Sequence, residues 1–134
     1  MGGGSWKHLG SDGSWVSLFE QYGVPVSKLK PSNCGFETKW SDFFKNRFQG
    51  QSLKPVTIMQ QEGIPAKQGE ITITSKGIEG GLIYSISACL RDIIEKEGSA
   101  VINIDLSPGR SIENITSKLS RPRGSSSISN HLIS

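Results

Sequence analysis

Hydrophobic and polar residues alternate in two neighbouring stretches near the middle of the chain. In residues 53–60 and 69–75, apolar side chains recur at every second position (Val56, Ile58, Ile71 and Ile73). This alternation is typical of a half-buried β-strand, whose successive side chains point to opposite faces. The residues Glu62-Gly63-Ile64-Pro65 between the two stretches favour a turn. The pattern therefore predicts a β-hairpin.

Helical spacing of apolar residues marks further stretches. Residues 82–97 carry a continuous apolar stripe that predicts one long helix, which Gly98 ends. Shorter helices are predicted at 14–22, 41–48 and 112–120, with Ser41 and Ser111 as N-terminal caps, and another begins within 125–134. Trp15, Leu18, Phe19 and Tyr22 share one face of the first short helix. In the others we expect apolar residues to face inward, namely Phe43, Phe44, Phe48, Ile115 and Leu119.

The remaining regular patterns indicate extended chain. Residues 26–39 read as an extended segment interrupted by Pro31, and residues 100–106 as a strand. In that strand the inward positions are Ala100, Ile102, Ile104 and Leu106. Strands followed by helices without a repeating strand–helix order predict the α+β class, with a small, mostly antiparallel sheet.

Composition and charge exclude several classes of protein. The 134 residues have a net charge of +3, and the positive side chains are scattered, so we expect no nucleic-acid partner. No stretch approaches the roughly 20 apolar residues of a membrane span, so no membrane association is expected. Cys34 and Cys89 lie far apart without metal-ligand spacing. We interpret them as small buried hydrophobic residues of a cytoplasmic protein, and we predict no metal site.

Glycine clusters supply the candidate binding residues. Gly2, Gly3 and Ser5 belong to a glycine-rich start that precedes a predicted helix and is able to approach a phosphate closely. The order G-x-G-x-x-G after a strand is absent, and a flexible terminus explains the same residues.

A second cluster lies between a predicted strand and the long helix. Gly77, Glu79, Gly80 and Gly81 form a turn that allows backbone to approach a ligand, and Tyr84 follows one helical turn later. A tight strand-to-helix turn explains these residues equally well, as core burial explains Tyr84. The sequence shows no Ser-His-Asp arrangement and no carboxylate pair with catalytic spacing.

A set of short motifs follows in a fixed order along nearly the whole chain: Gly2-Gly3-Gly4-Ser5-Trp6, Leu9-Gly10-Ser11-Asp12-Gly13, Pro31-Ser32-Asn33-Cys34-Gly35-Phe36, Leu53-Lys54-Pro55-Val56, Gly69-Glu70, Gly77-Ile78-Glu79-Gly80-Gly81-Leu82-Ile83-Tyr84, Leu90-Arg91-Asp92, Ile104-Asp105-Leu106, Ser120-Arg121-Pro122-Arg123-Gly124 and Ser129-Asn130-His131-Leu132. In this order of motifs the chain resembles a bacterial family of NAD(P)/FAD-dependent flavoproteins with an insert domain, known as BaiN-like or aminoacetone oxidase-like proteins.

The resemblance implies a domain organisation and a cofactor. Residues 1–24 match a remnant of a Rossmann-like FAD domain, 25–110 the β-barrel-like part of the insert, and 111–134 the start of its helical part. It places Gly2, Gly3 and Ser5 near FAD, and the glycine turn with Glu79 and Tyr84 at a cleft for a small-molecule substrate. The family's main dinucleotide motif is missing, so we expect a fragment that is inactive alone and binds FAD weakly or not at all.

Two other interpretations stay open at this stage. A stand-alone β-barrel that binds nucleotides or RNA would require aromatic side chains exposed on its strands and salt-sensitive binding. A purely structural remnant would show neither flavin nor nucleic-acid binding.

Overall fold

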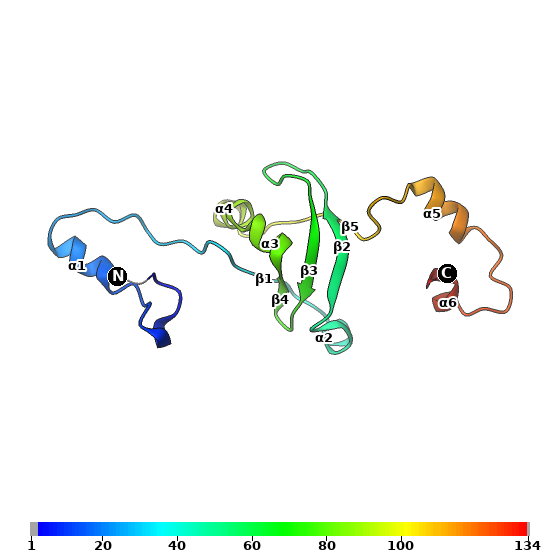
Figure 1. Ribbon diagram of the computed structural model, residues 1–134, viewed down its shortest axis with the longest axis horizontal. Helices are drawn as coiled ribbons and strands as arrows, with labels where there is room; N and C mark the ends of the chain where they lie inside the picture. The colour runs from blue at the N-terminus through cyan, green and yellow to red at the C-terminus, as the bar shows by residue number, and fades with distance from the viewer. Residues whose placement is uncertain (1–2, 134) are drawn as a thin grey trace.

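One antiparallel sheet forms the centre of the molecule. The computed structural model describes residues 3–133, and Gly2 lies outside the described residues. The five strands have the order β1-β4-β3-β2-β5. The sheet curls into a half-barrel with α3 and α4 beside it (Figure 1), so the predicted α+β class with a barrel-like sheet is confirmed. The strands are β1 (Phe36–Glu37), β2 (Ser52–Ile58), β3 (Lys67–Ile73), β4 (Gly77–Glu79) and β5 (Ile104–Asp105).

The predicted hairpin is the longest strand pair of this sheet. β2 and β3 pair in antiparallel register, from Ser52 opposite Thr72 to Ile58 opposite Lys67, with an irregularity between Leu53 and Val56. The side chains that alternate in sequence enter one core with residues of α3 and α4, because they share the concave face. The core consists of Val56, Ile58, Ile64, Ile71, Leu82, Ile83, Ile86 and Leu90.

The helices begin close to the predicted positions. They are α1 (Trp15–Gln21), α2 (Asp42–Phe48), α3 (Gly81–Ser85), α4 (Ser87–Glu97), α5 (Ile112–Leu119) and α6 (Ile128–Ile133). Both predicted caps are confirmed: the Oγ of Ser41 accepts a hydrogen bond from the N–H of Phe44, and the Oγ of Ser111 from that of Asn114, each at 3.2 Å. These caps satisfy amide groups that a helix start leaves without an internal partner.

The prediction of one continuous helix over 82–97 is wrong at Ile86. This residue has φ −117° and ψ 7°, so the helix divides into α3 and α4. The buried hydroxyl of Ser87, directly after the break, contacts the carbonyl oxygen of Tyr84 at 2.7 Å. The two short helices each bury a leucine in the shared core, Leu82 of α3 and Leu90 of α4.

The strand predicted over 100–106 is shorter than its sequence pattern indicates. Only Ile104 and Asp105 pair with β2, and Leu106 is 66% exposed instead of facing inward. The half-buried residues Ala100, Ile102 and Ile104 do pack against the core. The chain leaves the sheet after Asp105, so the side chain of Leu106 has no core to meet.

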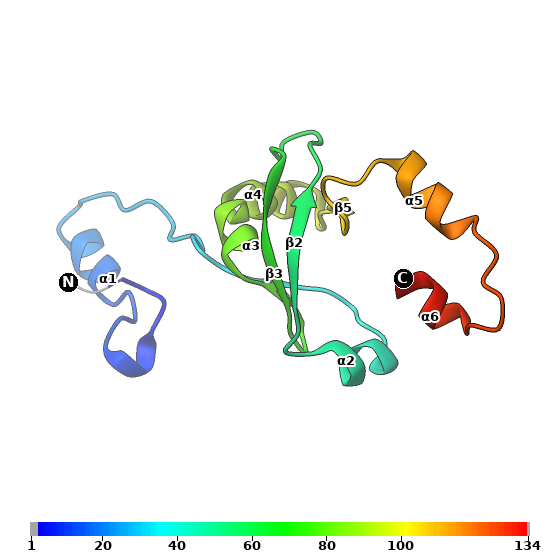
Figure 2. The same cartoon turned by 45° about the vertical axis from the view of Figure 1, so that its right-hand side comes forward.

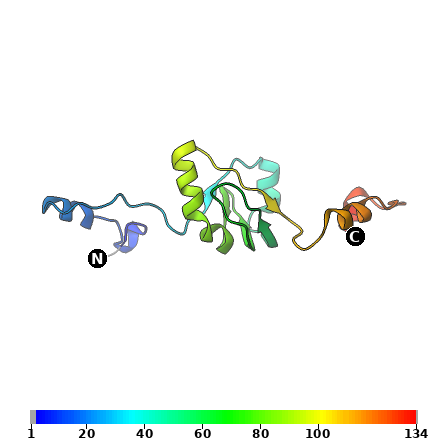
Figure 3. The same cartoon turned by 90° about the horizontal axis from the view of Figure 1, so that it is seen from above.

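The two terminal segments extend away from the sheet on opposite sides (Figures 1, 2 and 3), α1 on one side and α5 with α6 on the other. Two apolar side chains predicted to face inward are exposed, Phe43 of α2 (72%) and Leu119 of α5, whereas Phe44, Phe48 and Ile115 are half-buried. On the predicted apolar face of the first helix, Leu18 is exposed, as is Tyr22 directly after α1. Periodicity located α1, α2 and α5 correctly, but within the described residues part of the apolar face of each helix is left uncovered.

Candidate functional site

Residues 77–79, predicted as part of a turn, form strand β4. Gly77 lies opposite Glu37, and Ile78 opposite Phe36, in the β1–β4 pair. A Cβ atom on Gly77 would lie 1.9 Å from the carbonyl oxygen of Phe36, so only glycine fits. The indole N–H of Trp40 donates to the carbonyl oxygen of Gly77 at 3.2 Å. The backbone that Gly77 approaches closely is therefore that of β1.

The rest of this glycine turn lies on the surface between β4 and α3. Gly80 has a φ of +109°, and a Cβ there would lie 3.1 Å from the carbonyl oxygen of Glu70. A Cβ placed on Gly81 would meet no other atom within 4 Å. The side chain of Glu79 is exposed, and Tyr84 is 36% exposed. Four of the five predicted cleft residues thus present atoms to the surface. Their contact with a substrate stays a prediction.

The amino-terminal candidates lie in a separate small loop. The N–H of Gly13 donates to the carbonyl oxygen of Gly3 at 3.1 Å, and Ser5 is exposed on the same loop. In all three views this segment lies away from β4 (Figures 1, 2 and 3). The structure therefore does not bring Gly3 and Ser5 together with the Gly77–Gly81 turn.

Asp12 places a carboxylate next to the start of α1. The N–H of Ser14, just before the helix, donates to the Oδ1 of Asp12 at 3.0 Å. The hydrogen bonds from Ser14 lower the pKa of Asp12, so the charged carboxylate is favoured at this helix start. A phosphate at the same position would meet this negative charge, whereas dinucleotide sites leave the helix start free for the phosphate. The cofactor role predicted for Gly3 and Ser5 stays a prediction.

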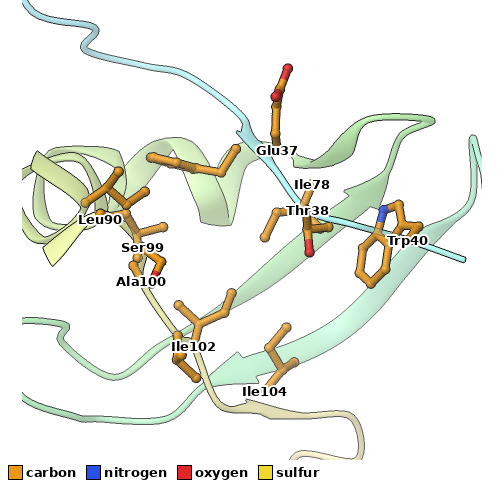
Figure 4. Close-up of a pocket in the computed structure, with 13 residues that line it drawn as sticks. Glu37, Thr38, Trp40, Ile78, Leu90, Ser99, Ala100, Ile102 and Ile104 are labelled. Atoms are coloured by element: carbon orange, nitrogen blue, oxygen red, sulfur yellow. The ribbon is translucent and has the colours of Figure 1, made fainter.

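An apolar groove opens between β1 and β5, the two edges of the half-barrel (Figure 4). Its volume is roughly 560 Å³. The lining comes from the chain around β1, from β4, from α4 and from the segment leading into β5: Phe36, Glu37, Thr38, Trp40, Ile78, Leu90, Ile94, Gly98, Ser99, Ala100, Val101, Ile102 and Ile104. Reasoning from sequence missed this groove because its walls come from distant stretches. The only signal was the apolar alternation over residues 100–104.

The chemistry of the groove is that of apolar binding. Glu37 is its only charged lining residue, and Figure 4 shows this side chain directed away from the apolar lining. Cys34 and Cys89 are half-buried free thiols, more exposed than the core position we predicted. No three His, Cys, Asp or Glu side chains among residues 3–133 are grouped to hold a metal ion. The groove thus provides shape and apolar contact, and no acid–base pair lines it.

Two further structural features bear on the class of protein. The only aromatic residue on the described strands is Phe36, which is half-buried, so the sheet offers no row of exposed aromatic rings for nucleic-acid bases. Within the described part of the chain, no helix is both long and apolar enough to cross a membrane.

Comparison with known proteins places this architecture in a family. Residues 30–134 match the family described as HI0933-like protein barrel and H2TH domain. The chain is also similar to the 3-dehydro-bile acid delta(4,6)-reductase of Clostridium scindens, with 26% identity over 107 residues. That match covers 80% of this chain and 26% of the reductase, so the chain spans about a quarter of this relative's length. The chain belongs to the HI0933-like family of flavoproteins with an insert domain, and it matches the family's barrel and H2TH domain.

Proposed function

We propose that this chain acts as the insert domain of an FAD-dependent oxidoreductase and forms one wall of the cleft where flavin and substrate meet. The observation that carries this proposal is the open apolar groove of a half-barrel that matches the family's barrel domain over residues 30–134. An apolar concave surface with few polar groups is the usual form of a small-molecule site.

In this proposal the flavin carries out the redox chemistry and the chain supplies only a wall of the cleft. The flavin supplies hydride or electron transfer when it is bound. Asp12 places a carboxylate beside the start of α1, where it accepts a hydrogen bond from the N–H of Ser14. We therefore infer that the chain alone is inactive as a fragment and binds FAD weakly or not at all. Gly3 and Ser5 would come near FAD only beside a complete dinucleotide-binding domain.

The surface turn after β4 is the part of the wall that we assign to the substrate. Glu79 and Tyr84 offer a carboxylate and a phenol there, and Gly80 and Gly81 leave the backbone accessible. The C. scindens relative is named as a reductase of a 3-dehydro-bile acid, which supports a small-molecule substrate. We also propose a cytoplasmic location in a bacterium, where the two free thiols stay reduced.

An exchange of segments tests the proposal. The matched segment of the C. scindens reductase is replaced by residues 30–134, and flavin content is read from visible absorbance. We expect a yellow protein with altered KM, because the exchanged part forms the cleft wall and not the phosphate cradle. In that protein, Glu79→Gln and Tyr84→Phe should raise KM several-fold without loss of flavin. Glu62→Gln, in the β2–β3 loop, is the control and should change neither quantity.

Two results would contradict the proposal. The first is a folded exchange protein that has lost its flavin, since residues 30–134 would then belong to the cofactor cradle. The second is stoichiometric FAD retained by the present chain after dialysis.

A further inference from the structure

Trp40 forms one end of the apolar groove. In Figure 4 its indole ring lies at the far end from Leu90 and Ala100, with Ile102 and Ile104 between the two ends. The indole is half-buried, so part of its surface is accessible from the groove. The side chains of Leu90 and Ala100 at the opposite end are aliphatic. The two ends of the groove therefore differ in chemistry.

Two contacts with residues that do not line the groove fix the orientation of this ring. The indole N–H of Trp40 donates to the carbonyl oxygen of Gly77 at 3.2 Å. The ring of Phe44 in α2 lies 4.6 Å away between ring centroids, at an angle of 31°, and the ring of Phe48 lies 4.8 Å beyond that of Phe44. A side chain held by both a hydrogen bond and packing keeps one rotamer. Trp40 therefore presents a rigid, flat surface to the groove.

Phe36, the other aromatic residue of the lining, has a different environment. It packs against the hydrophobic core, and it also borders a neighbouring hollow that Ile94 and Arg91 line. Trp40 belongs neither to the residues packed against the core nor to the lining of that hollow. Among the described residues of the groove, Trp40 is therefore the aromatic ring that is held from behind and open to a ligand in front.

A flat ligand ring makes more contact with a fixed indole than a puckered ring does. A planar unsaturated ring lies offset and parallel against the indole face, whereas a saturated ring touches it through a few atoms. Contacts between aromatic rings of this kind add roughly two- to tenfold in affinity beyond the effect of buried area. The opposite end of the groove offers the ligand aliphatic contact only.

We propose that Trp40 is the specificity-determining residue of the proposed cleft wall. It selects substrates that carry a planar unsaturated ring at one end and a saturated hydrocarbon body at the other. The planar ring lies on the indole, and the saturated body extends toward Leu90 and Ala100. This inference rests on the proposed function, because it assigns the substrate class of the same groove.

Two alcohols with the same skeleton test the selectivity: phenylhexanol and cyclohexylhexanol, each with its ring and its hydroxyl at opposite ends of the chain. Each is titrated into the isotope-labelled chain, and Kd is taken from the NMR shifts of groove residues. In Trp40→Leu we expect the ratio of the two Kd values to move roughly two- to tenfold in favour of the cyclohexyl compound. Comparing ratios removes the difference in hydrophobicity between the two alcohols.

Two further variants make the test specific. Trp40→Phe keeps a flat ring, so its ratio should change less than that of Trp40→Leu. Trp6→Leu is the matched control, because Trp6 is 59% exposed on the amino-terminal loop and does not line the groove. Its ratio should equal that of the unaltered chain.

The orientation of bound phenylhexanol is a second measurement, and it requires no variant. Isotope-filtered NOE spectra should show the phenyl protons close to the indole of Trp40. The methylene protons of the hexanol chain should lie close to the methyl groups of Leu90 and Ala100. This result stands even if Trp40→Leu does not fold.

Three results would overturn the inference: an unchanged Kd ratio in Trp40→Leu, phenyl protons that contact Leu90 or Ala100 in place of Trp40, or no shift of groove residues with either alcohol. None of these measurements involves flavin. A yellow exchange protein combined with any of them would refute the role of Trp40 and leave the proposed function standing. Loss of flavin from the folded exchange protein would refute the proposed function, whatever the Kd ratio.

Discussion

Gly77 is the residue where one added methyl group should disturb the sheet most. In Gly77→Ala the new Cβ would lie 1.9 Å from the carbonyl oxygen of Phe36 and 2.8 Å from the Cα of Glu37. Both neighbours are backbone atoms of β1, so no change of side-chain rotamer relieves the overlap. β1 must move away from β4.

The expected loss in the free energy of unfolding can be estimated from the contacts that this movement breaks. The β1–β4 pairing, the bond from Thr38 to Lys76 and the bond from the Trp40 indole to Gly77 would be lost or weakened. Two or three hydrogen bonds at about 1 kcal/mol each, together with partial exposure of Phe36, give about 3–4 kcal/mol. Domains of this size are stable by only about 5–15 kcal/mol. We therefore expect a loss of roughly 10 °C or more in Tm.

Gly81→Ala is the matched control, four residues away. Its Cβ meets nothing within 4 Å, and Gly81 is the first residue of α3. Alanine should therefore stabilise the chain slightly, by up to roughly 0.5–1 kcal/mol, because it loses less backbone freedom in a helix than glycine. The two variants are compared by urea and thermal unfolding monitored through tryptophan fluorescence. Equal stability of Gly77→Ala and Gly81→Ala would refute the steric reasoning.

Three further predictions concern the core and one surface carboxylate. Ile58→Ala should cost about 2–5 kcal/mol in urea unfolding, because its side chain is 0% exposed; a loss below 1 kcal/mol would show that the site collapses around the smaller residue. Ser87→Ala should cost about 1 kcal/mol in the same assay, because a hydroxyl 1% exposed to solvent contacts two backbone carbonyl oxygens; an unchanged midpoint would contradict this. A hydrogen bond with Ser52 and the nearby ammonium of Lys54 lower the pKa of Glu70, so its stabilising effect is present above the ordinary glutamate pKa and is lost as pH falls through the depressed value. Carboxyl NMR titration should accordingly show the pKa of Glu70 rising in Ser52→Ala, and an unmoved titration would contradict the assigned cause.

Local features of the sequence determined much of the secondary structure. Alternation at Ile71 and Ile73 predicted β3 with its buried face, and Ser41 and Ser111 marked helix starts that the structure confirms by their Oγ contacts. These features are predictable because each depends on residues within a few positions along the chain. The family resemblance added the barrel-like character of the sheet, which pattern alone did not provide.

Contacts between distant segments decided the rest. Residues 77–79 have a turn-like composition, yet they form a strand because β1 and β3 bind them from both sides. The break at Ile86 lies within a continuous apolar stripe that gives no sign of it, and Phe43 and Leu106 are exposed because no described surface faces them. The apolar groove is lined by residues from four separate parts of the chain, so no single stretch of sequence predicts it. Sequence periodicity shows which face of an element is apolar, but only the tertiary structure decides what covers that face, because burial requires a partner from elsewhere in the chain.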